Sequence, residues 1–200
     1  MNGWIVESNF IYYTITMLVR IMGCKEREEN INKMLESLPE NTEVIWDQKK
    51  DVVDTLTRTF DTDEDLVVFE DDVELCNNFW EKATAEIEKH KDCFIMFYWA
   101  NADDFIKYQD ECYNWPRVWT QAYYIPWWRG IARAMAEWVQ KDEYYTPKGR
   151  YSNPMANCLR AMKVKRHLVK PSLCQHLWFW HSLLPNHERC NHKSLTYKKE

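Results

Sequence analysis

The sequence lacks the cysteine spacing that is typical of a disulfide framework or a zinc site. Its seven cysteines are an odd number, and none of them forms a CxxC pair. Several fall inside apolar segments, so we expect reduced thiols and a cytoplasmic location. The histidines at 181, 187 and 192 lie near Cys190, but their irregular spacing argues against a zinc site in this segment.

Long apolar runs are also missing. The longest one near the N-terminus, residues 11–19, contains Tyr and Thr, has no basic region before it and no small-residue cleavage site after it. We therefore expect neither a secretory signal nor a membrane span, and no contact with a membrane. With 200 residues, the chain is long enough for a substantial core, and we expect one domain over residues 1–200.

Charge is unevenly distributed along the chain. The first 112 residues contain 11 Lys and Arg and 26 Asp and Glu, whereas the remaining residues contain 15 and 5. The two parts therefore carry net charges of −15 and +10. The basic part is a candidate surface for a polyanion such as nucleic acid. The alternative is that the two parts attract each other within the fold.

Apolar runs alternate with helical patterns in the first half of the chain. This order predicts an α/β fold, a Rossmann-type sandwich whose mainly parallel central sheet is flanked by helices. The predicted strands are residues 11–19, ending at Arg20, then 42–47 and 65–69; the predicted helices are residues 30–38 and 52–60.

The most informative segment is DLVVFEDDVELC, residues 65–76, in which an apolar strand leads directly into three carboxylates. Side chains alternate along a strand, so Glu70 and Asp72 are expected on one face and Asp71 on the other. Carboxylates that share a face repel one another unless a cation lies between them, and an oxygen-rich cluster suits Mg²⁺ or Mn²⁺. The alternative is a solvated acidic turn before a helix capped by Asn77.

This acidic motif and PSLCQH at residues 171–176 occur in an order that resembles GT-A glycosyltransferases, which use nucleotide sugars and carry a DxD-type motif. The likeness extends from about residue 12 to residue 176. It implies a GT-A-like fold and metal-dependent transfer of a sugar from a UDP-sugar to a hydroxyl group, with Mn²⁺ or Mg²⁺ as the cofactor. It also implies site residues: nucleotide contacts from Arg20, Arg27, Asp47, Glu70 and Asp71, and metal ligands at Asp72 and His176.

The resemblance weakens between residues 142 and 160. Many inverting members carry an acid here, which removes a proton from the acceptor hydroxyl. The matching stretch, residues 149–155, contains no acid. Asp142 is our candidate for the base; its neighbour Glu143, Asp103 and Asp104 are alternatives, as is a mechanism that does not use this kind of base. The same absence is compatible with a chain that binds ligands without catalysis.

The size of the chain is similar to that of small bacteriophage enzymes that glycosylate hydroxymethylated DNA bases. A modified base must leave the duplex to react, and a flipped base needs aromatic walls and cationic phosphate contacts. The basic part interleaves Trp and Tyr with candidate DNA contacts at Arg150, Arg160, Lys163, Lys165 and Arg166. A DNA acceptor, and the host cytoplasm as its location, are therefore the first hypothesis; a lipopolysaccharide or other glycan acceptor is the second.

Overall fold

The computed structural model describes residues 17–100, 118–148, 150–177, 194 and 196–199. The described strands are β1 Met17–Gly23, β2 Glu43–Trp46, β3 Asp65–Glu70, β4 Val73–Leu75, β5 Phe94–Met96, β6 Ala122–Ile125, β7 Arg166–Leu168 and β8 Cys174–His176. The α-helices are α1 Glu28–Leu35, α2 Val52–Thr59, α3 Phe79–Lys89, α5 Ile131–Lys141 and α6 Ser152–Ala161. Short 3₁₀ turns lie at Lys25–Arg27, Trp128–Gly130 and Thr146–Lys148.

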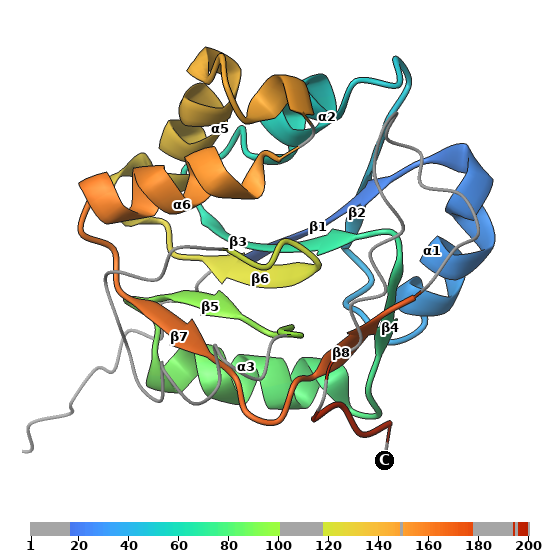
Figure 1. Ribbon diagram of the computed structural model, residues 1–200. Helices are drawn as coiled ribbons and strands as arrows, with labels where there is room; N and C mark the ends of the chain where they lie inside the picture. Colours follow the sequence, from blue (N-terminus) through green and yellow to red (C-terminus); the bar gives the residue numbers. More distant parts are fainter. Residues whose placement is uncertain (1–16, 101–117, 149, 178–193, 195, 200) are drawn as a thin grey trace, which may run out of the picture.

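Six strands form the central sheet in the order β2-β1-β3-β6-β5-β7 (Figure 1). Strand β1 pairs in parallel with β2 and β3, and β5 pairs in parallel with β7, whereas β6 is antiparallel to both of its neighbours. Five of the six strands therefore run in the same direction. The predicted α/β fold with a mainly parallel sheet and flanking helices is confirmed.

Helices cover both faces of this sheet (Figure 1). One face packs against α2, α5 and α6, and its core contains Leu56, Met135 and Leu159 from these helices. The other face packs against α1 and α3, with Ile31 and Phe79 in its core. Because both faces are covered, β3 reads as a continuous apolar run rather than an alternating one. No described helix is both long and apolar enough to cross a membrane.

The end of β1 differs from the prediction. The described strand continues past Arg20 to Gly23, so Arg20 lies inside it. A Cβ at position 23 would lie 2.5 Å from the Cδ1 atom of Ile31, so a larger residue there would require the Ile31 side chain to move. Glycine at this position therefore lets α1 pack closely against the end of β1, and the basic loop begins only at Cys24.

A second sheet of two strands forms beside the first one. Strand β4 pairs antiparallel with β8, and Val73 lies opposite His176 in the register. The backbone N–H of Leu177 also donates to the carbonyl of Asp72 at 2.6 Å. This pairing brings the C-terminal PSLCQH segment next to the acidic motif, although about a hundred residues separate them along the chain.

Candidate functional site

The parallel strands β1, β2 and β3 end side by side at one edge of the sheet. Gly23 lies opposite Trp46, and Met22 lies opposite Glu70. The backbone N–H of Asp47 donates to the carbonyl of Gly23 at 2.7 Å, which joins the ends of β1 and β2. This is the edge where open α/β sheets bind ligands, and the acidic motif follows β3 here.

Asp71 and Arg27 fasten the loop after β1 to the acidic turn. Arg27 Nη1 lies 2.6 Å from Asp71 Oδ1 and 2.9 Å from Asp72 Oδ2. The backbone N–H of Cys24 donates to the second oxygen of Asp71 at 2.7 Å. Burial raises the pKa of Asp71 although the charge of Arg27 opposes this. Both oxygens of Asp71 therefore have partners within the fold, which gives this residue a structural role in the described conformation.

Asp72 is held differently from Asp71. Its Oδ2 atom lies 3.2 Å from His176 Nε2, but its buried Oδ1 atom has no hydrogen-bond partner among the described residues. Burial alone would raise the pKa of Asp72, but His176 and Arg27 outweigh it and lower the pKa. Burial opposes the charged form of His176, yet the adjacent carboxylates raise its pKa. One oxygen of a buried carboxylate is thus available for a further ligand.

Glu70 is the second acid near Asp72. Tyr151 at the start of α6 donates its hydroxyl to Glu70 Oε1 at 2.7 Å, and Gln121 Nε2 donates to Oε2 at 3.2 Å. Burial raises the pKa of Glu70 to about 7, and the charge of Asp72 adds to the increase. The raised pKa of Glu70 thus follows first from burial and then from the negative charge of Asp72, and the nearby His176 opposes it.

Three residues that hold the acidic turn were not predicted from the sequence: Asn30, Gln121 and Tyr151. Asn30 lies inside α1, and its amide donates to the carbonyls of Asp71 at 2.7 Å and Val73 at 3.2 Å. The register of β6 against β3 could have indicated Gln121, since Phe69 lies opposite Ala122. No sequence signal points to Tyr151.

Arg20 does not lie at the edge where β1 ends. Its Nε atom pairs with Glu43 at 2.8 Å, and its Nη1 atom donates to the carbonyls of Thr59 at 2.8 Å and Asp61 at 3.3 Å. These contacts join β1 to β2 and to the C-terminal end of α2. The basic residue that the structure brings to the acidic turn is Arg27.

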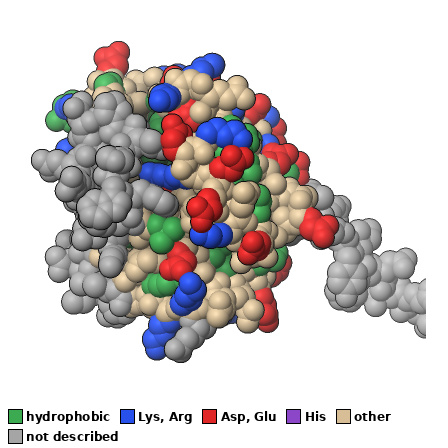
Figure 2. All heavy atoms as spheres, turned by 90° about the vertical axis from the view of Figure 1, so that its right-hand side faces the viewer, with side chains coloured by type: hydrophobic (Ala, Val, Ile, Leu, Met, Phe, Trp, Pro, Cys, Tyr) green, Lys and Arg blue, Asp and Glu red, His purple; other side chains and the backbone are tan. Residues whose placement is uncertain are grey.

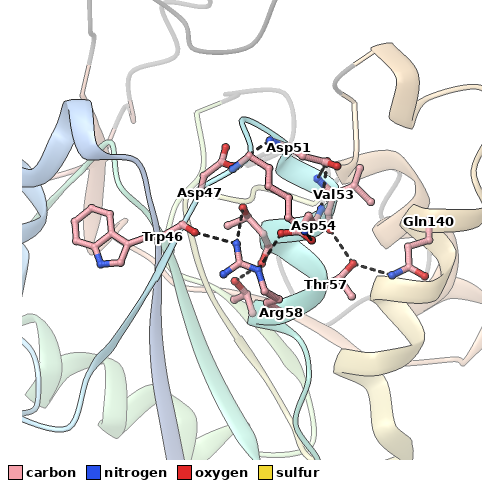
Figure 3. Close-up of polar contacts among 11 residues, drawn as sticks. Trp46, Asp47, Asp51, Val53, Asp54, Thr57, Arg58 and Gln140 are labelled. Atoms are coloured by element: carbon pink, nitrogen blue, oxygen red, sulfur yellow. Dashed lines mark hydrogen bonds and ion pairs between the residues drawn. The ribbon is translucent and has the colours of Figure 1, made fainter.

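Asp47 lies at the end of β2 and organises the turn before α2 (Figure 3). Its Oδ1 atom accepts hydrogen bonds from the backbone N–H groups of Lys49 at 3.2 Å and Asp51 at 3.1 Å. Asp51 in turn caps α2 by accepting from Val53 and Asp54. The described contacts of Asp47 are therefore those of a residue that holds a turn.

Asp142 ends α5 and holds the following turn. Its Oδ2 atom accepts from the backbone N–H groups of Tyr145 at 2.5 Å and Thr146 at 2.6 Å. These bonds give Asp142 a capping role, and its catalytic role stays a prediction. The alternative bases Asp103 and Asp104 lie outside the described residues, as do the tail histidines and Cys190.

The five predicted DNA contacts have different environments. Arg150, Arg160 and Lys163 are exposed, and Lys165 lies 4.0 Å from Asp92. Arg166, in contrast, is 0% exposed and donates from Nη2 to the carbonyl of Ala156 at 2.8 Å. The prediction that Arg166 contacts phosphate is wrong for this fold, because β7 points the side chain into the core beneath α6.

The acidic and basic parts of the chain also pair with each other. Arg133 contacts Asp61 and Asp63, and Lys199 contacts Glu74. Figure 2 shows acidic and basic side chains interspersed on the face beside α1 and β4, rather than one continuous patch of either sign. Part of the charge asymmetry along the sequence is therefore balanced within the fold.

Most described aromatic residues of the segment from Trp99 to Trp128 belong to the core. Trp99, Tyr123 and Tyr124 are at most 1% exposed. Trp127 is 61% exposed, and Trp138 on α5 is 42% exposed. Tyr108, Tyr113 and Trp115 lie outside the described residues. The aromatic density therefore reflects packing more than a binding surface.

The donor set at the acidic turn fits a hard or borderline divalent cation. The unpartnered Asp72 oxygen and the His176 imidazole supply one carboxylate and one nitrogen ligand. Mg²⁺ and Mn²⁺ sites commonly use only one or two protein ligands, and water and substrate phosphates complete the shell. Among the described residues, three potential ligand atoms lie within 4.8 Å of one another only at Glu86, His90 and His167, which form a separate group.

Comparison with known proteins adds no assignment. No protein-family model matches the chain, and no curated protein is similar enough to count as a relative. Arguments about function therefore depend on the geometry of the acidic turn and on the resemblance of its motifs.

Proposed function

We propose that the protein is a GT-A-like glycosyltransferase that depends on a divalent cation. It transfers a sugar from a UDP-sugar to a hydroxyl group, and the preferred acceptor is a hydroxymethylated base of DNA. The order of motifs supports this proposal, as does the position of the acidic turn at the carboxyl edge of a mainly parallel sheet. The contact between His176 and Asp72 brings the two motifs of the resemblance together.

One observation carries the proposal: Asp72 keeps a buried carboxylate oxygen without a hydrogen-bond partner among the described residues. Such an atom costs about 1–3 kcal/mol or more when it is charged. Glu70 beside it has a pKa raised to about 7. Both features are unfavourable for the protein alone, and a bound cation would relieve both of them.

The residues of the chain then have separate roles in the proposed reaction. Asp72 and His176 hold the cation, which supplies positive charge where the departing diphosphate becomes more negative. Arg27 keeps Asp72 oriented and adds a second positive charge at the same edge. Asp71 anchors Arg27 through the contact at 2.6 Å. Asp47 at the end of β2 is the proposed contact for the uracil ring.

Support for a DNA acceptor comes from the exposed residues Arg150, Arg160 and Lys163, which lie in α6 or within two residues of its ends. Helix α6 follows Tyr151, whose hydroxyl contacts Glu70, so the helix that carries these cations begins beside the acidic turn. Each phosphate contact releases counterions, and DNA binding should therefore weaken steeply as salt increases. Binding that does not depend on salt would reject the DNA acceptor.

The decisive assay incubates the protein with Mn²⁺ and labelled UDP-sugars, with and without DNA that contains 5-hydroxymethylcytosine. Release of UDP together with transfer of label to DNA supports the proposal. Release of UDP without DNA favours a glycan acceptor or hydrolysis. No release with any UDP-sugar contradicts the enzymatic proposal and favours a binding protein.

Two variants make this assay specific to the acidic turn. Asp72→Asn removes the proposed cation ligand and should abolish release of UDP. Glu74→Gln is the matched control, because Glu74 lies in the same acidic segment but pairs with Lys199. If Asp72→Asn releases UDP as fast as Glu74→Gln, the acidic turn does not act as proposed.

A further inference from the structure

A second group of potential metal ligands lies away from the acidic turn. Glu86 and His90 are one helical turn apart at the C-terminal end of α3, and His167 is the central residue of β7. Strand β7 alternates, so that Arg166 faces α6 while His167 faces the layer that contains α3. Two elements that are distant in the sequence thus bring these three side chains together.

The geometry of this group is close to that of a metal site. All three ligand atoms lie within 4.8 Å of one another. Glu86 Oε2 and His167 Nε2 are 3.2 Å apart. Two ligands about 2.0–2.1 Å from a tetrahedral ion are separated by about 3.3 Å. The imidazole rings of His90 and His167 are stacked, with centroids 3.7 Å apart, so at least one ring has to turn before both nitrogen lone pairs, which lie in the ring planes, point at one ion.

The surroundings orient the carboxylate of Glu86. Lys89 Nζ contacts Glu86 Oε1 at 2.8 Å, which leaves Oε2 directed at His167. Burial opposes ionisation, but the hydrogen bonds from Lys89 and His167 lower the pKa of Glu86. The side chains of Glu86 and His167 are partly exposed, so an ion and its water ligands have access to the site.

We propose that Glu86, His90 and His167 bind a transition-metal ion of the zinc class and thereby join α3 to β7. Two imidazoles with one carboxylate favour Zn²⁺ over Mg²⁺ or Ca²⁺, which prefer oxygen ligands. The remaining coordination position belongs to water. This site is independent of the proposed glycosyltransferase site, because it shares no residue with it.

The test uses the full chain after treatment with a chelator. Co²⁺ serves as a spectroscopic probe, and Zn²⁺ binding is measured by calorimetry. The parent protein should show the visible absorption of low-coordinate Co²⁺. Zn²⁺ at a hundredfold excess over its Kd should raise Tm by about 5–10 °C. A parent protein with neither signal overturns the proposal.

Variants locate the binding site. Glu86→Gln, His90→Gln and His167→Gln should each remove one equivalent of bound Zn²⁺, and the apo forms are checked for an unchanged fold by circular dichroism. Glu88→Gln on the same helix and His176→Gln at the acidic turn are the controls and should keep this equivalent. If the double variant of His90 and His167 binds Zn²⁺ with the same stoichiometry and affinity as the parent protein, the ion binds elsewhere.

Discussion

The acidic turn after β3 and the group of Glu86, His90 and His167 carry similar ligands in opposite settings. At the acidic turn, charges are buried, and one oxygen of Asp72 has no partner among the described residues. In the second group, three ligand atoms lie within 4.8 Å of one another, and their side chains are partly exposed. Proximity of ligands therefore does not by itself show where charge is unfavourable; burial and missing partners do.

The comparison predicts that the acidic turn is sensitive to the loss of a single positive charge. Arg27→Ala would leave Asp71 and Asp72 buried without their shared partner, and unfolding free energy should fall by about 3–5 kcal/mol. Urea denaturation measures this loss. Arg133→Ala is the control, because its ion pairs with Asp61 and Asp63 are exposed and worth about 0–1 kcal/mol. Similar losses of unfolding free energy in Arg27→Ala and Arg133→Ala would refute the distinction between the buried and the exposed ion pairs.

The second prediction concerns pH. Glu70 has a folded pKa of about 7 and an ordinary value of 4.5, so the folded state binds its proton more tightly than the unfolded state. Stability contributed by this proton is present below pH 4.5 and is lost as pH rises to about 7. Glu70→Gln should therefore stabilise the metal-free protein at pH 8 by on the order of 3 kcal/mol.

Thermal or urea denaturation across pH 4.5 to 8 tests the Glu70 prediction. The parent protein should lose stability over this range more steeply than Glu70→Gln, and Glu74→Gln should follow the parent. Addition of Mn²⁺ at pH 8 should recover part of the parent's loss. Parallel pH profiles for the parent and Glu70→Gln would mean that Glu70 ionises normally.

The smallest of these effects concerns the support of the turn by α1. Asn30→Ala removes the hydrogen bonds to the carbonyls of Asp71 and Val73, and it should destabilise the protein by about 1–2 kcal/mol. Asn32→Ala is the matched control, because Asn32 is exposed on the same helix and the gain in helix propensity is the same. Equal unfolding free energies for the two variants would remove Asn30 from the support of the site.

Periodicity predicted much of the fold, because the apolar faces of α1 and α2 and the buried run of β3 are local patterns. The end of β1 was misplaced, because its last residues, 21–23, belong to the strand through pairing with β2 and β3, which lie further along the chain.

The rest of the site depends on contacts between distant segments. Pairing of β4 with β8 brings His176 to Asp72, and β7 buries Arg166; neither event leaves a pattern in the sequence. A basic run such as residues 160–170 predicts charge at the surface, but a strand within it alternates between surface and core. Sequence reasoning therefore identified the acids as a cluster, and the resemblance paired His176 with Asp72, but nothing in the sequence indicated the support of the turn by Asn30, Gln121 and Tyr151.

Calorimetric titration of UDP into the chelator-treated protein, with and without Mn²⁺, tests the central claim most directly. The account predicts that UDP binds the parent and Glu74→Gln only in the presence of Mn²⁺, and that Asp72→Asn loses this binding while it remains folded. If Asp72→Asn binds UDP with Mn²⁺ as tightly as the parent, the cation is not held by the acidic turn, and the proposed function is contradicted.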